Sequence, residues 1–197
     1  MNATNIKSFK TIDRLHEIRV SGLGGQGVIL TTHILGVAAM FADLEVMQTQ
    51  KYGPENRGSK VVSHLLVAPP GQKIWLPIVT NPTFLCTMAQ LAYDKSARKV
   101  KHKGIIMYDV DTVKPFENIA EDIVQIPFPG SKIAIELKNK LVTNIVFLGG
   151  MLGIFEFIKL ETVERAIKQV VNPKFHDLNI KALKSGYEEI QKILKNN

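Results

Sequence analysis

The chain has 197 residues, of which 45% are hydrophobic and 22% charged, and it carries a net charge of +7. This length and composition are typical of one globular domain with a sizeable core. The basic residues are spread out rather than gathered in a block. A zinc finger and an aromatic RNA-binding pair are both missing, which argues against nucleic-acid binding.

Cysteine and histidine usage limits the chemistry that the chain can carry. Cys86 is the one cysteine, so it can neither form an internal disulfide nor hold an iron–sulfur cluster, which takes four ligands. The histidines lie far apart in the sequence, so we expect no metal site. The first 20 residues lack the apolar stretch of a secretory signal, and we therefore expect a cytoplasmic protein.

In chain order, the pattern first predicts a strand, a glycine loop and a helix. Residues 17–22 alternate in polarity and end at glycine, and residues 27–42 carry apolar side chains at helical spacing. Strands are expected next at 45–50 and 60–68, joined by the polar loop 51–59. Because no helix separates these two strands, the sheet is expected to be mixed.

The rest of the chain continues the alternation of helices and strands. Residues 141–158 contain Asn144 and three glycines, so they predict a buried, closely packed helix rather than a membrane span. Together the elements indicate an α/β fold, a three-layer Rossmann-like domain with a mostly parallel, mixed sheet over residues 17–197, preceded by an N-terminal extension, 1–16. The remaining elements are expected to be helix 81–100, strands 103–111 and 123–128, and helices 131–139, 159–171 and 176–196.

The glycine loop, SGLGGQGVIL at 21–30, is the first candidate site. Gly22, Gly24 and Gly27 have the spacing of a dinucleotide-binding loop between a strand and a helix, where backbone N–H groups favour a phosphate. An NAD site also needs an acidic residue at the end of the second strand, but that strand ends in Thr49-Gln50-Lys51. A Walker A loop needs a lysine where Val28 stands. A tight connection that binds nothing is the simplest alternative.

The second candidate is TQKYGPENRGS at 49–59, at the end of the second strand. If the first two strands run parallel, this segment lies at the same sheet edge as the glycine loop. Lys51 and Arg57 supply charge for an anion, and Tyr52 can stack or hydrogen-bond. Gly58 helps to shape the loop. The two segments together predict one anion-binding site.

These paired motifs resemble the gamma subunit of 2-oxoacid:ferredoxin (acceptor) oxidoreductases. The resemblance covers nearly all of the chain after residue 16 and includes LAYDK, GIIMYDVD, NIVFLGGMLG and LNIKALKSGYE. YGPE at 52–55 favours the 2-oxoglutarate, branched-chain oxoacid and pyruvate branches over the indolepyruvate enzymes, and QTQ.YGPE leans toward 2-oxoglutarate.

The resemblance implies a reaction and a role. Family members decarboxylate a 2-oxoacid on thiamine diphosphate, pass electrons through [4Fe-4S] clusters to ferredoxin or another acceptor, and form acyl-CoA. The gamma part is similar to a domain that helps to bind coenzyme A. On this sequence, the residues that would approach the coenzyme A phosphates are Gly22, Gly24, Gly25, Gln26 and Gly27, and those of the second wall are Lys51, Tyr52, Arg57 and Gly58.

By the same resemblance, thiamine diphosphate and the clusters belong to partner chains, namely alpha, beta and delta-type subunits. Ser59 departs from the family pattern, in which a second glycine is common at this place, and the serine narrows the freedom of the backbone. Two alternatives stay open, a free-standing dinucleotide-binding oxidoreductase and a non-catalytic interaction module.

Overall fold

The computed structural model describes residues 6–52 and 59–196. It contains one six-stranded sheet in the order β2-β3-β1-β4-β5-β6. The strands are β1 (His16–Leu23), β2 (Glu45–Tyr52), β3 (Lys60–Ala68), β4 (Phe84–Thr87), β5 (Ile105–Asp109) and β6 (Val124–Phe128). The α-helices are α2 (Val28–Phe41), α3 (Gln90–Ser96), α4 (Gly130–Glu136), α5 (Thr143–Leu152), α6 (Leu160–Val170) and α7 (His176–Lys195).

The sheet is mixed, as the sequence predicts. β4 pairs in parallel with β1 and β5, and β5 pairs in parallel with β6. β3 is antiparallel to both of its neighbours, β1 and β2. Because only seven residues separate the end of β2 from the start of β3, too few for a crossover between parallel strands, these two strands run in opposite directions. The prediction of a mostly parallel, mixed α/β sheet is confirmed.

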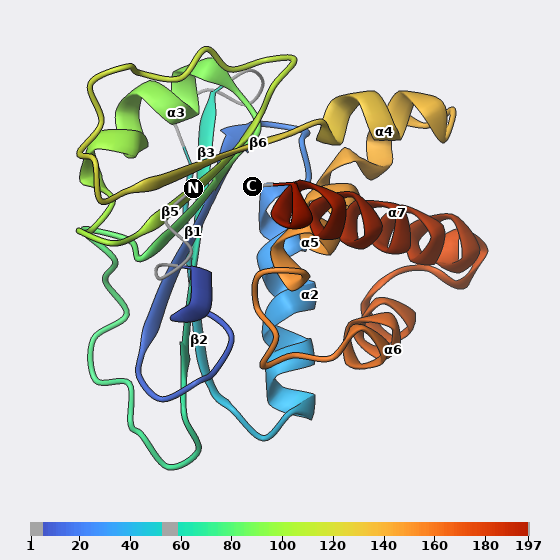
Figure 1. Cartoon of the computed structure of the whole chain (residues 1–197). Helices are drawn as coiled ribbons and strands as arrows, with labels where there is room; N and C mark the ends of the chain where they lie inside the picture. Colours follow the sequence, from blue (N-terminus) through green and yellow to red (C-terminus); the bar gives the residue numbers. More distant parts are fainter. Residues whose placement is uncertain (1–5, 53–58, 197) are drawn as a thin grey trace.

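Helices cover the two faces of the sheet unequally (Figure 1). One face carries α2 and α4 to α7, whose buried side chains form the main core with Ile18, Val20 and Phe84. The other face carries α3, which packs through Tyr93 on Leu85 in a second, smaller core. The three layers of the predicted fold are therefore present, with most of the helical mass on one side.

Two predicted helices are wrong in their extent. The region predicted as one helix, 81–100, contains the strand β4 before α3 begins at Gln90. β4 is four residues long and fully buried on both faces, so it lacks the alternation that marks a half-buried strand. The prediction that 141–158 forms one buried helix holds only to Leu152, where α5 ends.

Close glycine packing joins α5 to α7, as expected for a buried helix rich in glycine. A Cβ at Gly149 would lie 2.0 Å from the carbonyl oxygen of Leu183, and one at Gly186 would lie 2.0 Å from that of Val146. The two backbones are therefore in direct contact. In the part of the chain that the structure describes, no helix is long and apolar enough to cross a membrane.

Candidate functional site

The glycine loop connects β1 to α2 at the carboxyl end of β1. Gly25 has φ of 94° and Gly27 has φ of 68°, a left-handed conformation that favours glycine. The N–H of Gln26 donates to the carbonyl of Leu23 at 3.1 Å, which closes the turn. The N–H of Gly24 donates to the carbonyl of Ser59 at 3.0 Å. The loop is thus tied directly to the end of the second predicted motif.

Three glycines of the loop serve different purposes. A Cβ at Gly22 would lie 2.6 Å from Oε1 of Gln26, and one at Gly27 would lie 2.5 Å from Nδ2 of Asn144. A side chain at Gly22 would therefore displace the Gln26 amide, and one at Gly27 would displace the Asn144 amide. A Cβ at Gly25 would meet no atom within 4 Å, so the space in front of this residue is open. Gly25 is the glycine that leaves backbone accessible to a ligand.

The Gln26 side chain holds the loop in shape. Its Oε1 accepts a hydrogen bond from the N–H of Leu23 at 2.6 Å, and its Nε2 donates to the carbonyl of Met88 at 3.2 Å. Met88 follows β4, so this amide joins the ends of two neighbouring parallel strands. The sequence predicts that Gln26 binds the ligand, which stays a prediction, and in the structure its side chain holds the loop in position.

The start of α2 has backbone N–H groups without hydrogen-bond partners, next to the open space in front of Gly25. α2 has no side-chain N-cap and no acidic residue in its first turn. Among the described residues, the N–H groups of Gly25, Gly27 and Val28 have no hydrogen-bond partner. Free N–H groups at a helix N-terminus, together with the helix dipole, attract an anion.

The strand order places this loop at a switch point of the sheet. α2 leaves β1 toward one face, and α3 leaves β4, the neighbouring strand, toward the other. In open α/β sheets such a reversal opens a crevice at the carboxyl ends of the two strands, and ligands bind there. The glycine loop therefore lies where open α/β sheets commonly bind ligands, which is consistent with the predicted site.

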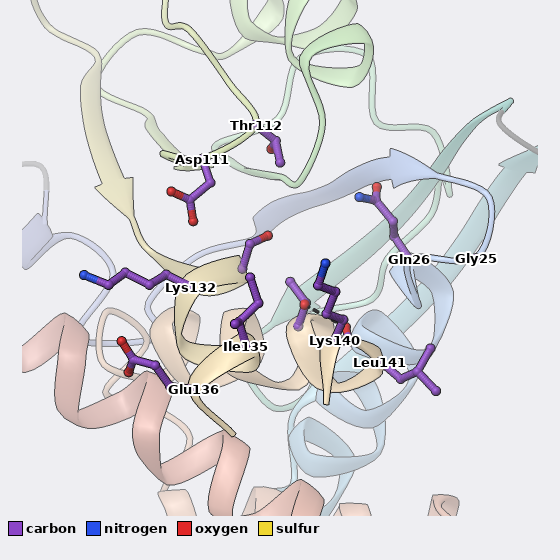
Figure 2. A pocket seen from close by; sticks show the side chains of 11 residues that line it. Gly25, Gln26, Asp111, Thr112, Lys132, Ile135, Glu136, Lys140 and Leu141 are labelled. Carbon is purple, nitrogen blue, oxygen red and sulfur yellow. Dashed lines mark hydrogen bonds between the residues drawn. The ribbon is translucent and has the colours of Figure 1, made fainter. Parts of the chain in front are cut away.

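A pocket of about 740 Å³ lies beside the loop, on the side of α4 (Figure 2). Gly25 and Gln26 form one wall, and the segments after β5 and β6 form the others. The sequence analysis did not predict these other lining residues, although Asp111 is the last residue of one predicted strand and Ser131 is the first residue of the helix predicted after the next strand. The lining residues that the sequence missed are Asp111, Thr112, Ser131, Lys132, Ile135, Glu136, Lys140, Leu141 and Thr143.

A buried carboxylate fixes the wall formed by α4. Asp109, the last residue of β5, is fully buried, and burial raises the pKa of its carboxyl. The Ser131 hydroxyl donates to its Oδ2, and the N–H of Asp111 donates to its Oδ1 at 3.1 Å. Asp109 thus holds the start of α4 and the turn after β5 in place around the pocket.

The second predicted motif reaches the expected edge of the sheet. Gly22 of β1 and Tyr52 of β2 both pair with Val61 of β3, from opposite sides, so β1 and β2 end together. Lys51 is exposed at this end and is not among the residues that line the pocket. Arg57 and Gly58 lie outside the described residues, and their predicted role stays a prediction.

The edge next to the loop is electropositive. Lys60, the first residue of β3, pairs in register with Leu23 at the start of the glycine loop. Burial, followed by the neighbouring positive charges of Arg19 and Lys99, lowers the pKa of the Lys60 amine. Positive charges that lower one another's pKa are stabilised when an anion binds.

This chemistry fits the binding of an anionic ligand rather than bond making. Cys86 is fully buried, and burial raises the pKa of its thiol, so it offers no thiolate. Within 6–52 and 59–196, no group of three or more His, Cys, Asp or Glu side chains could hold a metal ion. The described residues therefore offer no ligand set for an iron–sulfur cluster.

Comparisons with known proteins agree with the motifs and the fold. Residues 17–189 match the model of the pyruvate ferredoxin/flavodoxin oxidoreductase family. The 2-oxoglutarate synthase subunit KorC of Methanocaldococcus jannaschii is 36% identical over 95% of this chain and 97% of its own. The crystal structure of the keto/oxoacid ferredoxin oxidoreductase gamma subunit from Geobacter sulfurreducens has a TM-score of 0.77, with 30% identity over 90% of this chain and 99% of that one.

A second similar structure is a longer chain. The 2-oxoglutarate:ferredoxin oxidoreductase from Magnetococcus marinus, solved with 2-oxoglutarate, coenzyme A and succinyl-CoA bound, has a TM-score of 0.76 at 24% identity. The alignment covers 93% of this chain but 31% of that one, and it shows a shared fold. The protein belongs to the pyruvate ferredoxin/flavodoxin oxidoreductase family, among the gamma subunits of the 2-oxoacid:ferredoxin oxidoreductases.

Proposed function

We propose that this gamma subunit binds coenzyme A at its glycine loop within a complex that oxidises a 2-oxoacid to acyl-CoA and CO2. Thiamine diphosphate and the [4Fe-4S] clusters sit in alpha, beta and delta-type partner subunits, and electrons leave to ferredoxin or another acceptor. The similarity to a 2-oxoglutarate synthase subunit favours 2-oxoglutarate as the oxoacid. The single cysteine of the chain fits a reducing, cytoplasmic location.

One observation carries the coenzyme A assignment. Gly25 has a left-handed backbone and lines a pocket at the N-terminus of α2. A Cβ at this residue would meet no atom within 4 Å, so the space in front of the backbone is open. An open approach to free N–H groups suits a diphosphate, which coenzyme A carries and a 2-oxoacid lacks. The related enzyme solved with coenzyme A bound has the same fold, which supports the assignment.

A substitution that closes this approach tests the proposal. Gly25→Ala places a methyl group in the open space, and in the assembled complex we expect it to raise the KM for coenzyme A by about tenfold or more. The KM for the oxoacid should change much less. Steady-state kinetics with each substrate varied in turn measures both values.

Gly71→Ala is the matched control. Gly71 also has positive φ, 77°, and open space where a Cβ would stand, but it lies in a turn remote from the pocket. Both variants therefore carry the same kind of backbone strain. If the two raise the KM for coenzyme A equally, or if only the oxoacid KM moves in Gly25→Ala, the glycine loop is not the coenzyme A site.

A further inference from the structure

An exposed apolar segment lies on the side of the sheet opposite to α2 (Figure 1, lower left). Residues 72–79, here called the arm, join β3 to β4 and belong to no helix or strand. Three of its large apolar side chains are exposed, Trp75 by 83%, Leu76 by 62% and Ile78 by 58%. Single exposed apolar residues are common, but three within four positions form a patch of the kind that marks a protein–protein contact.

The sheet holds the backbone of the arm in place. Nη2 of Arg19 donates to the carbonyl oxygens of Val79 at 2.7 Å and of Thr80 at 3.1 Å. The Thr49 hydroxyl donates to the carbonyl oxygen of Pro77 at 3.2 Å. These bonds fix the main chain and leave the large apolar side chains on the outside. A segment that is ordered before it meets a partner loses less conformational entropy on binding.

Positive charges lie beside the arm on the same face. Arg19 pairs in register with Leu85, on which α3 packs, so the arm and α3 cover the same side of the sheet. The Asn81 amide, just after the arm, donates to the carbonyl oxygen of Lys99 at 2.9 Å. Lys99 ends the short 3-10 helix that follows α3, and Lys95 precedes it by one helical turn. Both lysines are exposed, so a cationic stripe borders the end of the arm.

These charges lack acidic partners. Lys60, Lys73, Lys95 and Lys99 make no salt bridge to any described residue, although other lysines of the chain do. Burial, then the charge of Arg19, then those of Lys99 and Lys95 lower the pKa of the Lys60 amine, so the lysines act on one another. Like charges that lie together are stabilised when a partner brings carboxylates to them.

We propose that the arm and the lysines beside it form the contact of this chain with an acidic surface of a partner subunit in the same complex. Carboxylates of that subunit pair with Lys95 and Lys99, and its apolar side chains cover Trp75 and Leu76. The inference rests on the proposed function only in that this chain works within a complex. It adds which face of the chain meets a partner and which chemistry the partner presents.

Two other protein partners fit this face less well. A second copy of the chain in a symmetric contact would bring the same lysines against one another. An electron acceptor must approach a redox group, and the described residues offer no ligand set for a metal cluster. An exposed tryptophan among aliphatic side chains is instead typical of the centre of a long-lived subunit interface.

Cross-linking of the intact complex identifies the chain that lies against the lysines. A carbodiimide joins an amine to a carboxylate that is in direct contact with it, and mass spectrometry of the peptides identifies both ends. We expect links from Lys95 or Lys99 to an Asp or Glu of a different subunit. If these lysines form no link, or link only to a second copy of this chain, the inference is overturned.

Charge reversal measures what the lysines contribute. The double variant Lys95→Glu with Lys99→Glu should raise the apparent Kd of this chain in the complex about tenfold or more at low salt, measured by native mass spectrometry after dilution. Its loss from the complex should also depend less on KCl concentration than in the wild type. Lys168→Glu with Lys181→Glu makes the same change of charge on exposed positions of α6 and α7, and should leave both quantities at the wild-type value.

The arm is tested through its tryptophan. Trp75→Ala should raise the apparent Kd about tenfold at every KCl concentration, because the contact that it removes is apolar and not screened by salt. Trp75→Phe keeps an aromatic ring and should retain most of the affinity. Because Trp75 is mostly exposed in this chain, neither change removes a core side chain. If Trp75→Ala leaves the apparent Kd unchanged, the arm does not meet a partner subunit.

The outcomes separate this inference from the proposed function. If the charge-reversed complex stays assembled but needs a higher concentration of electron acceptor, the face binds the acceptor, so the inference fails and the proposed function stands. The proposed function fails by itself if Gly25→Ala leaves the KM for coenzyme A unchanged in a complex that the arm and the lysines still hold together.

Discussion

The two faces of the sheet are stabilised in different ways. The face under α2 and α4 to α7 is held by a large apolar core in which Phe84, Phe128 and Phe147 are fully buried. The opposite face has a small apolar core around Tyr93, and next to it a buried polar cluster. In this cluster Arg19 of β1 donates to His64 of β3 and to two backbone carbonyls.

The difference follows from what covers each face. A face covered by helices buries apolar surface, whereas the segment after β3 crosses the other face as extended chain, with backbone carbonyls that need donors. Arg19 meets this need, since it donates to Val79 at 2.7 Å and to Thr80 at 3.1 Å. On the face covered by α2 and α4 to α7, we therefore expect larger side chains to lower the free energy of unfolding most. On the opposite face, we expect changes of charge or hydrogen bonding to have the larger effect.

The largest effect is expected where α5 and α7 touch. Gly186→Val inserts a side chain whose Cβ would lie 2.0 Å from the carbonyl oxygen of Val146, so the two helices must separate. We expect a loss of about 3 kcal/mol or more in the free energy of unfolding, measured by urea denaturation. Glu188→Val, on an exposed position of the same helix, controls for helix propensity and should cost less than about 1 kcal/mol. Equal losses would contradict the close packing.

The polar face predicts a dependence on pH. Nε2 of His64 accepts from Nε of Arg19 at 3.0 Å, and burial, followed by the charge of Arg19, lowers the pKa of His64 to about 4. In the unfolded chain the pKa of histidine is about 6.5, so the unfolded state takes up a proton first. As the pH falls from about 6.5 to about 4, the folded chain should lose roughly 3 kcal/mol of stability from this group. Above pH 6.5 His64 is neutral in both the folded and the unfolded chain, so this loss of stability is absent.

His64→Gln isolates that contribution. Its amide oxygen can still accept from Arg19, but it does not titrate. The difference in unfolding free energy between wild type and this variant should therefore vary with pH in the range of 4 to 6.5, while carboxylates common to both cancel. A difference that stays constant over this range would mean that burial and the charge of Arg19 do not lower the pKa of His64 in the folded chain.

The same contrast explains how far the sequence predicts the molecule. The strand, glycine loop and helix at 16–41 follow from local patterns, because the glycines and helical periodicity are written in consecutive residues. β4 was missed because a strand buried on both faces has no periodicity. Lys140 and Asp111 were missed because the order β1-β4-β5-β6 brings their segments beside the loop, and no local pattern encodes that order.

Gln26 joins the two halves of the sheet and should have an intermediate effect. Gln26→Leu keeps the volume but leaves the N–H of Leu23 and the carbonyl of Met88 without their partner. We expect a loss of about 2 kcal/mol in unfolding free energy and a weaker affinity for coenzyme A, since the loop is no longer held. Gln169→Leu, on the exposed side of α6, is the control. An unchanged stability in Gln26→Leu would show that the loop holds its shape without this amide.

The smallest effect is expected in the second core, where a single hydroxyl connects three segments. The Tyr93 hydroxyl donates to Oε1 of Gln125 at 2.6 Å and accepts from the N–H of Phe116 at 3.0 Å. Tyr93→Phe keeps the ring in place, so the loss should be about 1 kcal/mol, measured by urea denaturation. Tyr108→Phe removes a hydroxyl that makes no hydrogen bond to any described residue, and it should change stability by less than about 0.5 kcal/mol. If both variants cost the same, ring packing rather than hydrogen bonding holds this face as well, and the contrast between the two faces is lost.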